Sequence, residues 1–315
     1  MEKKLPKTYQ DIKALKIQGA TAIAKAIISA LKNYGVNYQP KTIKDWESNI
    51  KKAAFYLLSA RPTEPLAQNG IKFILLELKK VKPKNTIQAK NCLKKTTDEF
   101  LHLMENAAKL IIPFGRSIIK NNDNVLTHCH SWLVEQILIS TKKSNKKFQV
   151  FNTETRPFFQ GRITSKQLVK AGVDTTMITD SSAGFLISRH SGKNLMIDKI
   201  IIGADAILKN GVAINKIGSF GIAVAAFTEK VPIYVAAPLL KFHPASWIKI
   251  EERSPKEIWP QAPKKLKIIN FAFDLIPPEY ITGFITEFGI IKPKNLRKIL
   301  KKYYPWILNN KQNYI

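Results

Sequence analysis

The residues best suited to chemistry are a cysteine and an aspartate, each placed close after a run of apolar residues. Cys129 lies in the run Leu126-Thr-His-Cys-His-Ser131, between a predicted strand and an apolar-faced helix. Helix N-termini stabilise anions and lower thiol pKa values, so this thiol is expected to act as a base or nucleophile. Asp205 follows Ile200-Ile-Ile-Gly-Ala, where partial burial favours a protonated carboxyl group that can donate a proton.

Each of these residues also has a plainer interpretation. Most free cysteines are small buried apolar residues, and an aspartate after a strand commonly forms a turn. A metal site is not expected, because in an extended strand His128 and His130 point to one side and Cys129 to the other. A metal is therefore not predicted.

Several cations and polar groups follow other predicted strands. Arginines there could hold a phosphate or carboxylate through two parallel hydrogen bonds, although an ion pair with Glu154 explains them equally well. Asn215-Lys-Ile-Gly-Ser219 opens a predicted helix, where free amides and an ammonium group would attract an anion, with Ser219 or Asn215 as the cap. The candidate anion-binding residues are Arg61, Arg156, Gln160, Arg162, Asn215, Lys216 and Lys241.

Composition narrows the class of protein. The 315 residues carry a net charge of +28. Of the 51 basic residues only seven are arginine, and the lysines are scattered along the chain, so a nucleic-acid partner is not expected. No apolar run could span a bilayer and the two cysteines do not suggest a disulfide framework, so we expect a cytoplasmic protein without a membrane partner.

The periodicity of apolar residues changes near residue 115. Before it, the 3.6-residue period predicts helices over 11–31 (interrupted near Gly19), 42–58, 65–78 and 86–112. After it, short apolar runs predict strands over 125–128, 148–152, 176–179, 199–203, 233–237, 268–271 and 283–287, with helices over 132–141, 165–171 and 217–228.

This alternation predicts an α/β fold with two domains. An N-terminal helical domain (1–115) precedes a Rossmann-like domain (116–315), in which a parallel sheet has helices on both faces. Ligands of such sheets bind beyond the carboxyl ends of the strands, which is where the candidate residues fall.

Several segments, taken in order, resemble one known family. They are Ile17-Gln-Gly-Ala-Thr21, Thr127-His-Cys-His-Ser131, Glu154-Thr-Arg-Pro157, Gly203-Ala-Asp205, Asn215-Lys-Ile-Gly218, Lys241-Phe-His-Pro244 and Phe273-Asp-Leu-Ile-Pro-Pro-Glu-Tyr-Ile281. The family holds the alpha, beta and delta subunits of the eukaryotic exchange factor for translation initiation factor two, together with two sugar-phosphate isomerases. The chain looks most like the archaeal ribose 1,5-bisphosphate isomerases.

The resemblance implies that the chain makes ribulose 1,5-bisphosphate from ribose 1,5-bisphosphate, in the degradation of AMP and nucleosides. Cys129 would take the proton from C2, and Asp205 would donate a proton that assists ring opening. This reaction would use neither a metal nor a nicotinamide, so no cofactor is expected. Substrate phosphates would be bound by Gln18, Gly19, Ala20, Thr21, Arg61, Ser131, Asn215, Lys216 and Lys241.

Two alternatives come with the resemblance. The isomerases carry arginine where this chain has Gln18, and a neutral side chain binds a dianion more weakly. The first alternative is therefore a non-catalytic regulatory subunit that binds initiation factor two, and the second is methylthioribose 1-phosphate isomerase. A homo-oligomer, either a dimer or a hexamer, is implied in each case.

Overall fold

The computed structural model describes residues 4–308, and these form two compact units. The first unit comprises residues 4–106, Leu240–Pro244 and 303–308, and the second comprises Ala107–Leu239 and Ala245–Lys302. The chain thus passes from the first unit to the second between Asn106 and Ala107, within one long helix and before residue 115. Two later segments, 240–244 and 303–308, belong to the first unit again. No helix in the described part of the chain combines the length and apolarity needed to cross a membrane.

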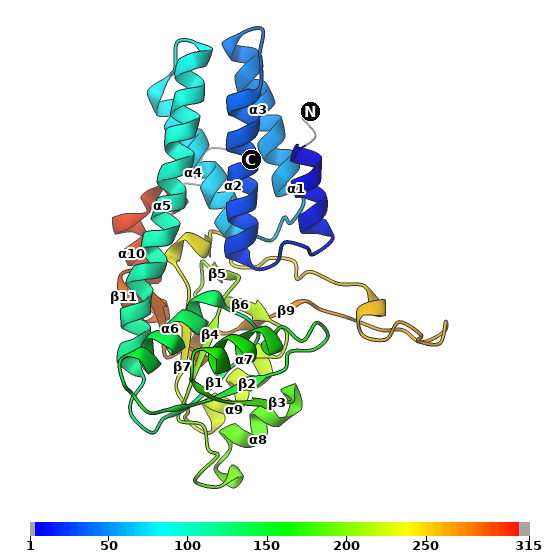
Figure 1. The fold of residues 1–315 in the computed structure, drawn as a ribbon, viewed down its shortest axis with the longest axis vertical. Coiled ribbons are helices and arrows are strands. Elements are labelled where there is room, and N and C mark those ends of the chain that lie inside the picture. The colour runs from blue at the N-terminus through cyan, green and yellow to red at the C-terminus, as the bar shows by residue number, and fades with distance from the viewer. Residues whose placement is uncertain (1–3, 309–315) are drawn as a thin grey trace. The chain divides into compact units, whose positions relative to one another are not determined.

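The first unit is helical, as the period predicts. Its helices are α1 (Lys4–Lys13), α2 (Ala20–Asn37), α3 (Ile43–Leu58), α4 (Pro65–Val81) and the first part of α5 (Thr86–Ile118) (Figure 1). Thr42 caps α3 by accepting a hydrogen bond from the Asp45 amide at 3.1 Å. The segment predicted as one interrupted helix is two helices, because Leu15 and Gly19 adopt positive φ values of 57° and 82° between α1 and α2.

Two later segments complete the first unit. The side-chain amide of Asn69 donates to the backbone carbonyl groups of Leu240 and Phe242, both at 2.8 Å, which ties 240–244 to α4. Lys72 donates to the carbonyl of Ile307 at 3.2 Å. The Trp306 ring lies 5.5 Å from the Phe73 ring, so the segment around Trp306 packs on the same helix.

The second unit is built on a mixed sheet with the strand order β11-β10-β7-β4-β1-β2-β3. All pairs in it are parallel except β10 with β11. The strands are β1 (Asn124–Thr127), β2 (Gln149–Thr153), β3 (Asp174–Ile178), β4 (Lys199–Gly203), β7 (Ile233–Ala236), β10 (Gly283–Thr286) and β11 (Gly289–Ile291).

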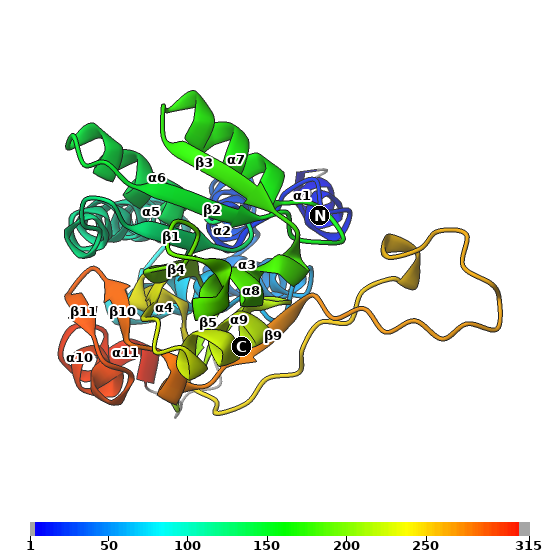
Figure 2. The ribbon, with the colours of Figure 1, turned by 90° about the horizontal axis from the view of Figure 1, so that it is seen from below.

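Helices cover both faces of this sheet. Figure 2 shows α6 (Trp132–Lys143) and α7 (Gly161–Lys170) on one side, with α8 (Ala183–Ile187) and α9 (Ser219–Thr228) on the other. Val125, Val150 and Ile201 are fully buried in the core between the sheet and α6. The predicted architecture of a helical region followed by a largely parallel sheet with helices on both faces is therefore confirmed.

One predicted strand is wrong and a second sheet was not predicted. Residues 268–271 form no strand, because Phe271 makes only an isolated bridge to Glu252 and Ile269 is 68% exposed. The strand begins two residues later, as β9 (Phe273–Ile276). It pairs antiparallel with β6 (Ala213–Lys216), which pairs antiparallel with β5 (Ala206–Leu208).

The remaining elements are short. They are β8 (Phe242–His243), α10 (Leu296–Tyr303), α11 (Pro305–Leu308) and the 3₁₀ turns Asp180–Ser182, Arg189–Ser191, Leu239–Lys241, Pro255–Glu257, Pro278–Tyr280 and Pro293–Asn295.

Candidate active site

Cys129 and Asp205 follow neighbouring parallel strands. In β1 and β4, Leu126 is paired with Ile200, so the residues after the two strands lie at the same edge of the sheet. Asp205 is half-buried and its amide donates to the Ile214 carbonyl at 2.8 Å, which starts the pairing of β5 with β6. The charge of Asp205 is close enough to raise the pKa of the Cys129 thiol. The two groups expected to carry acid–base chemistry are therefore neighbours.

The backbone of Cys129 is held in an unusual conformation. Its φ of 70° is in the left-handed region, where few residues other than glycine are found. Its amide donates to Thr155 Oγ1 at 3.0 Å, and its carbonyl accepts from Thr164 Oγ1 at 3.1 Å. Its Sγ lies 3.8 Å from Gln160 Oε1. These contacts fix where the sulfur is held.

The expectation of an easily ionised thiol is wrong for this structure. Burial raises the pKa of the Cys129 thiol to about 11, against the opposing attraction of Lys216 and a backbone hydrogen bond from His130, while Asp205 and Asp180 raise it further. The α6 N-cap is Ser131, two residues beyond Cys129. The loss of water around the sulfur therefore outweighs the effect of the helix N-terminus.

We predict that Cys129 reacts slowly with iodoacetamide at neutral pH. With Cys92→Ser as the background, the rate should rise about tenfold per pH unit from pH 7 to at least pH 9, because only the thiolate reacts. The fraction of Cys129 that is not yet alkylated can be measured by mass spectrometry of the peptide that contains it. A rate that levels off before pH 9 would show an ordinary or acidified thiol instead.

The two histidines beside Cys129 have separate structural partners. His128 lies 2.6 Å from Thr153 Oγ1 and 2.9 Å from the Ile217 carbonyl. His130 Nδ1 lies 3.0 Å from Thr164 Oγ1. Within residues 4–308, no three His, Cys, Asp or Glu side chains are grouped as metal ligands would be.

Sequence reasoning missed two residues that hold this edge together, Thr155 and Asp180. Asp180 accepts hydrogen bonds from the amides of Thr155 (2.8 Å) and Arg156 (2.7 Å). Thr155 in turn accepts from the Cys129 amide. A signal was present in the sequence, because Asp180 directly follows a predicted strand and so falls at the same edge.

The two candidate arginines of this segment have different partners. Arg162 is exposed, forms an ion pair with Glu154 at 3.5 Å, and lies over the Phe159 ring at 3.8 Å. The ion-pair interpretation therefore describes Arg162. The Arg156 guanidinium donates instead to the Ile258 carbonyl at 3.2 Å.

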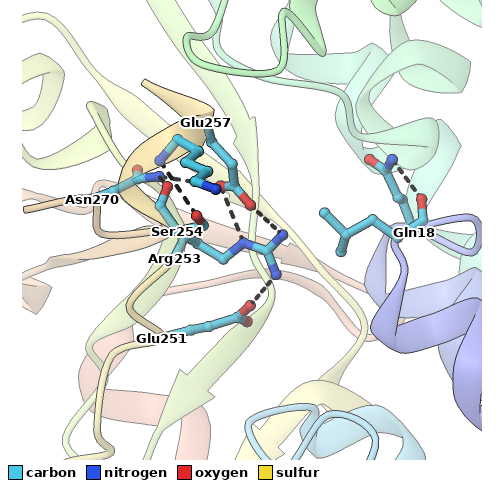
Figure 3. A network of polar contacts seen from close by, with 8 residues as sticks. Gln18, Glu251, Arg253, Ser254, Glu257 and Asn270 are labelled. Atoms are coloured by element: carbon cyan, nitrogen blue, oxygen red, sulfur yellow. Dashed lines mark hydrogen bonds and ion pairs between the residues drawn. The ribbon is translucent and has the colours of Figure 1, made fainter. Parts of the chain in front are cut away.

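Ile258 belongs to a long irregular segment, 245–272, which extends from the second unit (Figure 2). Within this segment, Arg253 donates to Glu251 at 3.0 Å and to Glu257 at 2.7 Å (Figure 3). A pocket of about 340 Å³ lies beside it and adjoins the candidate site through Arg156 and Ile217. Its lining comprises Arg156, Pro157, Ile217, Ile258, Ile269, Asn270 and Phe271.

The start of α9 differs from the predicted anion site. Gly218 is the N-cap rather than Ser219 or Asn215, and Asn215 donates its side-chain amide to Ser219 Oγ at 2.9 Å. The amides of Gly218 and Phe220 both donate to Asp274 Oδ2 and are not free for a phosphate. The cap prediction fails because a glycine with φ of 106° makes the turn, and the amides are bound by a residue distant in sequence.

Ser131 caps α6 by accepting from the Val134 amide at 3.4 Å. A Cβ atom at Gly203 would lie 2.8 Å from Ser131 Oγ, so glycine is needed at the end of β4 for this close approach. This places Ser131 at the same edge as Cys129 and Asp205.

The other predicted binding residues belong to the first unit. Gln18 donates to the Leu15 carbonyl at 2.8 Å (Figure 3). Gly19 is the N-cap of α2, and Ala20 is buried whereas Thr21 is exposed. Arg61 is half-buried after α3, and Lys241 ends a 3₁₀ turn. The position of each of these residues is therefore set by the local structure of the first unit.

Comparison with known proteins gives consistent relatives. Residues 16–293 match the model of the Initiation factor 2 subunit family. The chain is 37% identical to a ribose 1,5-bisphosphate isomerase of Methanocaldococcus jannaschii, over 96% of each chain. It is 35% identical to a methylthioribose-1-phosphate isomerase of Thermoanaerobacter sp. (strain X514), over 94% of this chain and 90% of that one.

A solved structure agrees in fold. A translation initiation factor eIF-2B of Pyrococcus horikoshii OT3 matches with a TM-score of 0.80 and 27% identity, covering 93% of this chain and 98% of that one.

Proposed function

This chain belongs to the Initiation factor 2 subunit family, and we propose that it is the aldose–ketose isomerase that converts ribose 1,5-bisphosphate to ribulose 1,5-bisphosphate. An isomerase activity is supported by the names of its relatives, which are 34% to 37% identical over nearly the full length. The observation that carries the proposal is the neighbouring pair of Cys129 and Asp205 at the carboxyl edge of β1 and β4.

The chemistry requires an acid and a base on one sugar. In ribose 1,5-bisphosphate the oxygen on C1 bears a phosphate. The sugar therefore has no C1 hydroxyl group whose proton could be lost to open the ring. In the proposal, Asp205 enters the reaction in its protonated form and gives that proton to the ring oxygen as the bond from that oxygen to C1 breaks. The Cys129 thiolate takes the C2 proton, and the electrons of that C–H bond form a double bond between C1 and C2.

The second half restores both groups. The Cys129 thiol returns its proton to C1, and the proton of the C2 hydroxyl passes to the Asp205 carboxylate, which leaves a ketone at C2. The thiolate is a minor species at neutral pH, but it is a strong base because its conjugate acid has a pKa of about 11. The lysine at 216 favours this thiolate by its charge.

The substrate phosphates are assigned to the cationic and polar residues that the sequence nominated. In the second unit these are Ser131, Arg156, Gln160, Asn215 and Lys216, with Arg162 already in its ion pair with Glu154. In the first unit they are Gln18, Gly19, Ala20, Thr21, Arg61 and Lys241. The substitution Arg61→Met is expected to raise KM more than it lowers kcat if Arg61 binds phosphate.

The substrate is tested by direct comparison. Purified full-length protein is supplied with ribose 1,5-bisphosphate and methylthioribose 1-phosphate in parallel, and the ketose products are measured by mass spectrometry and NMR. We expect kcat/KM to be at least about tenfold higher for the bisphosphate, since its second phosphate adds charge-assisted hydrogen bonds. A preference for methylthioribose 1-phosphate would reverse the assignment of substrate and keep that of the catalytic pair.

A non-catalytic role is the second candidate, favoured by the match to a structure described as translation initiation factor eIF-2B and by Gln18. It predicts no turnover of any 1-phosphorylated pentose and stoichiometric capture of initiation factor two. The acid–base pair at one edge of the sheet has no purpose in that role, which is why we place it second.

We also propose that the chain forms a homo-oligomer. Phe220, Val224 and Phe227 recur along one side of α9 and are 46%, 38% and 58% exposed. Because α9 is apolar on its exposed side as well as its buried side, a second copy of the chain would remove this surface from water. Sedimentation of the full chain measures the number of subunits.

A further inference from the structure

The turn that carries Lys216 is bound from both sides by groups with no assigned role. It joins β6 to α9 and consists of Lys216, Ile217 and Gly218. Lys216 is the side chain whose charge favours the Cys129 thiolate, whereas Asp205 and Asp180 oppose it. Where this turn lies therefore determines how much positive charge the sulfur experiences.

His128 binds one side of the turn. Its Nε2 lies 2.9 Å from the Ile217 carbonyl, which can only accept, so Nε2 carries the hydrogen. Its Nδ1 then accepts from the Thr153 hydroxyl at 2.6 Å. Burial lowers the pKa of His128, so the ring is neutral. The ring also packs on Gly218, where a Cβ atom would lie 3.1 Å from its Cε1.

Asp274 binds the other side. It lies opposite Asn215 in the pairing of β6 with β9, and its Oδ2 accepts from the amides of Gly218 (2.8 Å) and Phe220 (3.0 Å). Its Oδ1 is buried and has no hydrogen-bond partner among the described residues. The neighbouring Phe273 supports the lysine directly, because the Lys216 ammonium lies 5.0 Å from the centre of its ring.

We propose that His128 and Asp274 are positioning residues that together hold the turn so that the Lys216 ammonium stays close to the Cys129 thiol. They act on the reaction only through Lys216. Asp274 does so by its two hydrogen bonds and not by its charge, since a negative charge would by itself oppose the thiolate. The proposal depends on the proposed function only for its consequence in turnover.

The direction of the effect separates the two actions of Asp274. Asp274→Asn keeps an oxygen that can accept from the Gly218 and Phe220 amides but removes the charge. Asp274→Ala removes both the hydrogen bonds and the charge. If Asp274 acted by charge alone, either variant would make the thiol ionise more easily. If it holds the turn, only Asp274→Ala has a large effect, and that effect makes ionisation harder.

The experiment is a double-mutant cycle on the alkylation rate of Cys129. All variants carry Cys92→Ser, and rates with iodoacetamide are measured between pH 8 and 9, where lysine is still charged. Lys216→Met is made alone and with Asp274→Ala, Asp274→Asn or His128→Ala. Circular dichroism and thermal melting verify that each variant folds.

Lys216→Met alone should raise the thiol pKa by about one unit and slow alkylation about threefold, since the smaller thiolate fraction is partly offset by greater nucleophilicity. In the Asp274→Asn background, Lys216→Met should still slow alkylation about threefold. With Asp274→Ala or His128→Ala, Lys216→Met should have no further effect. The effect of Lys216→Met is measured within each background, so the changes that the background substitution itself makes around the sulfur cancel.

The proposal is overturned if Lys216→Met has the same effect in every background, or if Asp274→Ala speeds alkylation. If Asp274→Ala does not fold, the His128→Ala background decides by the same criterion. Because alkylation needs no substrate, these outcomes are separate from the proposed isomerase. If the wild-type protein turned over no sugar phosphate while the alkylation rates changed as expected, the proposed function would be refuted. The positioning role of His128 and Asp274 would still stand.

Discussion

Cys129→Ser should reduce turnover of ribose 1,5-bisphosphate by at least about 10³-fold, because a hydroxyl group is a far poorer proton acceptor than a thiolate. The serine Oγ occupies nearly the same place as the sulfur, and the backbone contacts to Thr155 and Thr164 do not involve the side chain. Substrate binding should therefore change little. The measurement is kcat and KM for the purified variant, with substrate affinity measured by calorimetry.

Cys92→Ser is the matched control for this prediction. Cys92 is the other cysteine of the chain, is half-buried in α5, and belongs to the first unit. Its replacement should leave kcat and KM within about twofold, as expected for a substitution away from the reacting atoms. If Cys129→Ser keeps a tenth or more of the wild-type kcat, Cys129 is not the base.

Asp205→Asn should cost about 10² to 10⁴-fold in kcat, which is the usual contribution of a general acid. Asparagine has the same shape as aspartic acid, and the amide hydrogen bond from residue 205 to Ile214 is a backbone contact that the substitution preserves. An amide group cannot deliver a proton to the ring oxygen. The loss should appear in kcat and kcat/KM together, since the donated proton is needed only in the transition state.

A second measurement shows whether this loss is specific. The charge of Asp205 raises the pKa of the Cys129 thiol, so Asp205→Asn should make Cys129 easier to ionise and faster to alkylate at pH 8.5. An inactive variant with faster alkylation has lost its acid while keeping its base in place. Slower alkylation would mean that the substitution disturbed the site, and activity above a tenth of wild type would remove Asp205 from the mechanism.

The sequence anticipated the general architecture because its signals are local. The helical period before residue 115 and the short apolar runs after it depend on neighbouring residues, and the helices and most of the strands form where these patterns are. The rule that ligands bind at the carboxyl ends of parallel strands then nominated Cys129 and Asp205, and the register of β1 with β4 brings these two together.

Local patterns were less reliable where the chain turns back on itself. The apolar run 268–271 has the composition of a strand, yet Ile269 is 68% exposed and the paired strand begins at Phe273. The residue types of this run do not distinguish the last part of the irregular segment 245–272 from a strand of the sheet. The antiparallel pairing of β5, β6 and β9 was missed for the same reason, since partners such as Lys216 and Phe273 are distant in sequence.

What the sequence determined by itself is the type of fold, together with the two residues proposed as the acid–base pair. What only the tertiary structure decided is the surroundings of the groups at the site. Burial raises the pKa of the Cys129 thiol to about 11, and Asp274 takes amides of α9 that the sequence left for a phosphate. Both depend on which atoms surround a group once distant segments pack together, and solvent exclusion of that kind leaves no local pattern in the chain.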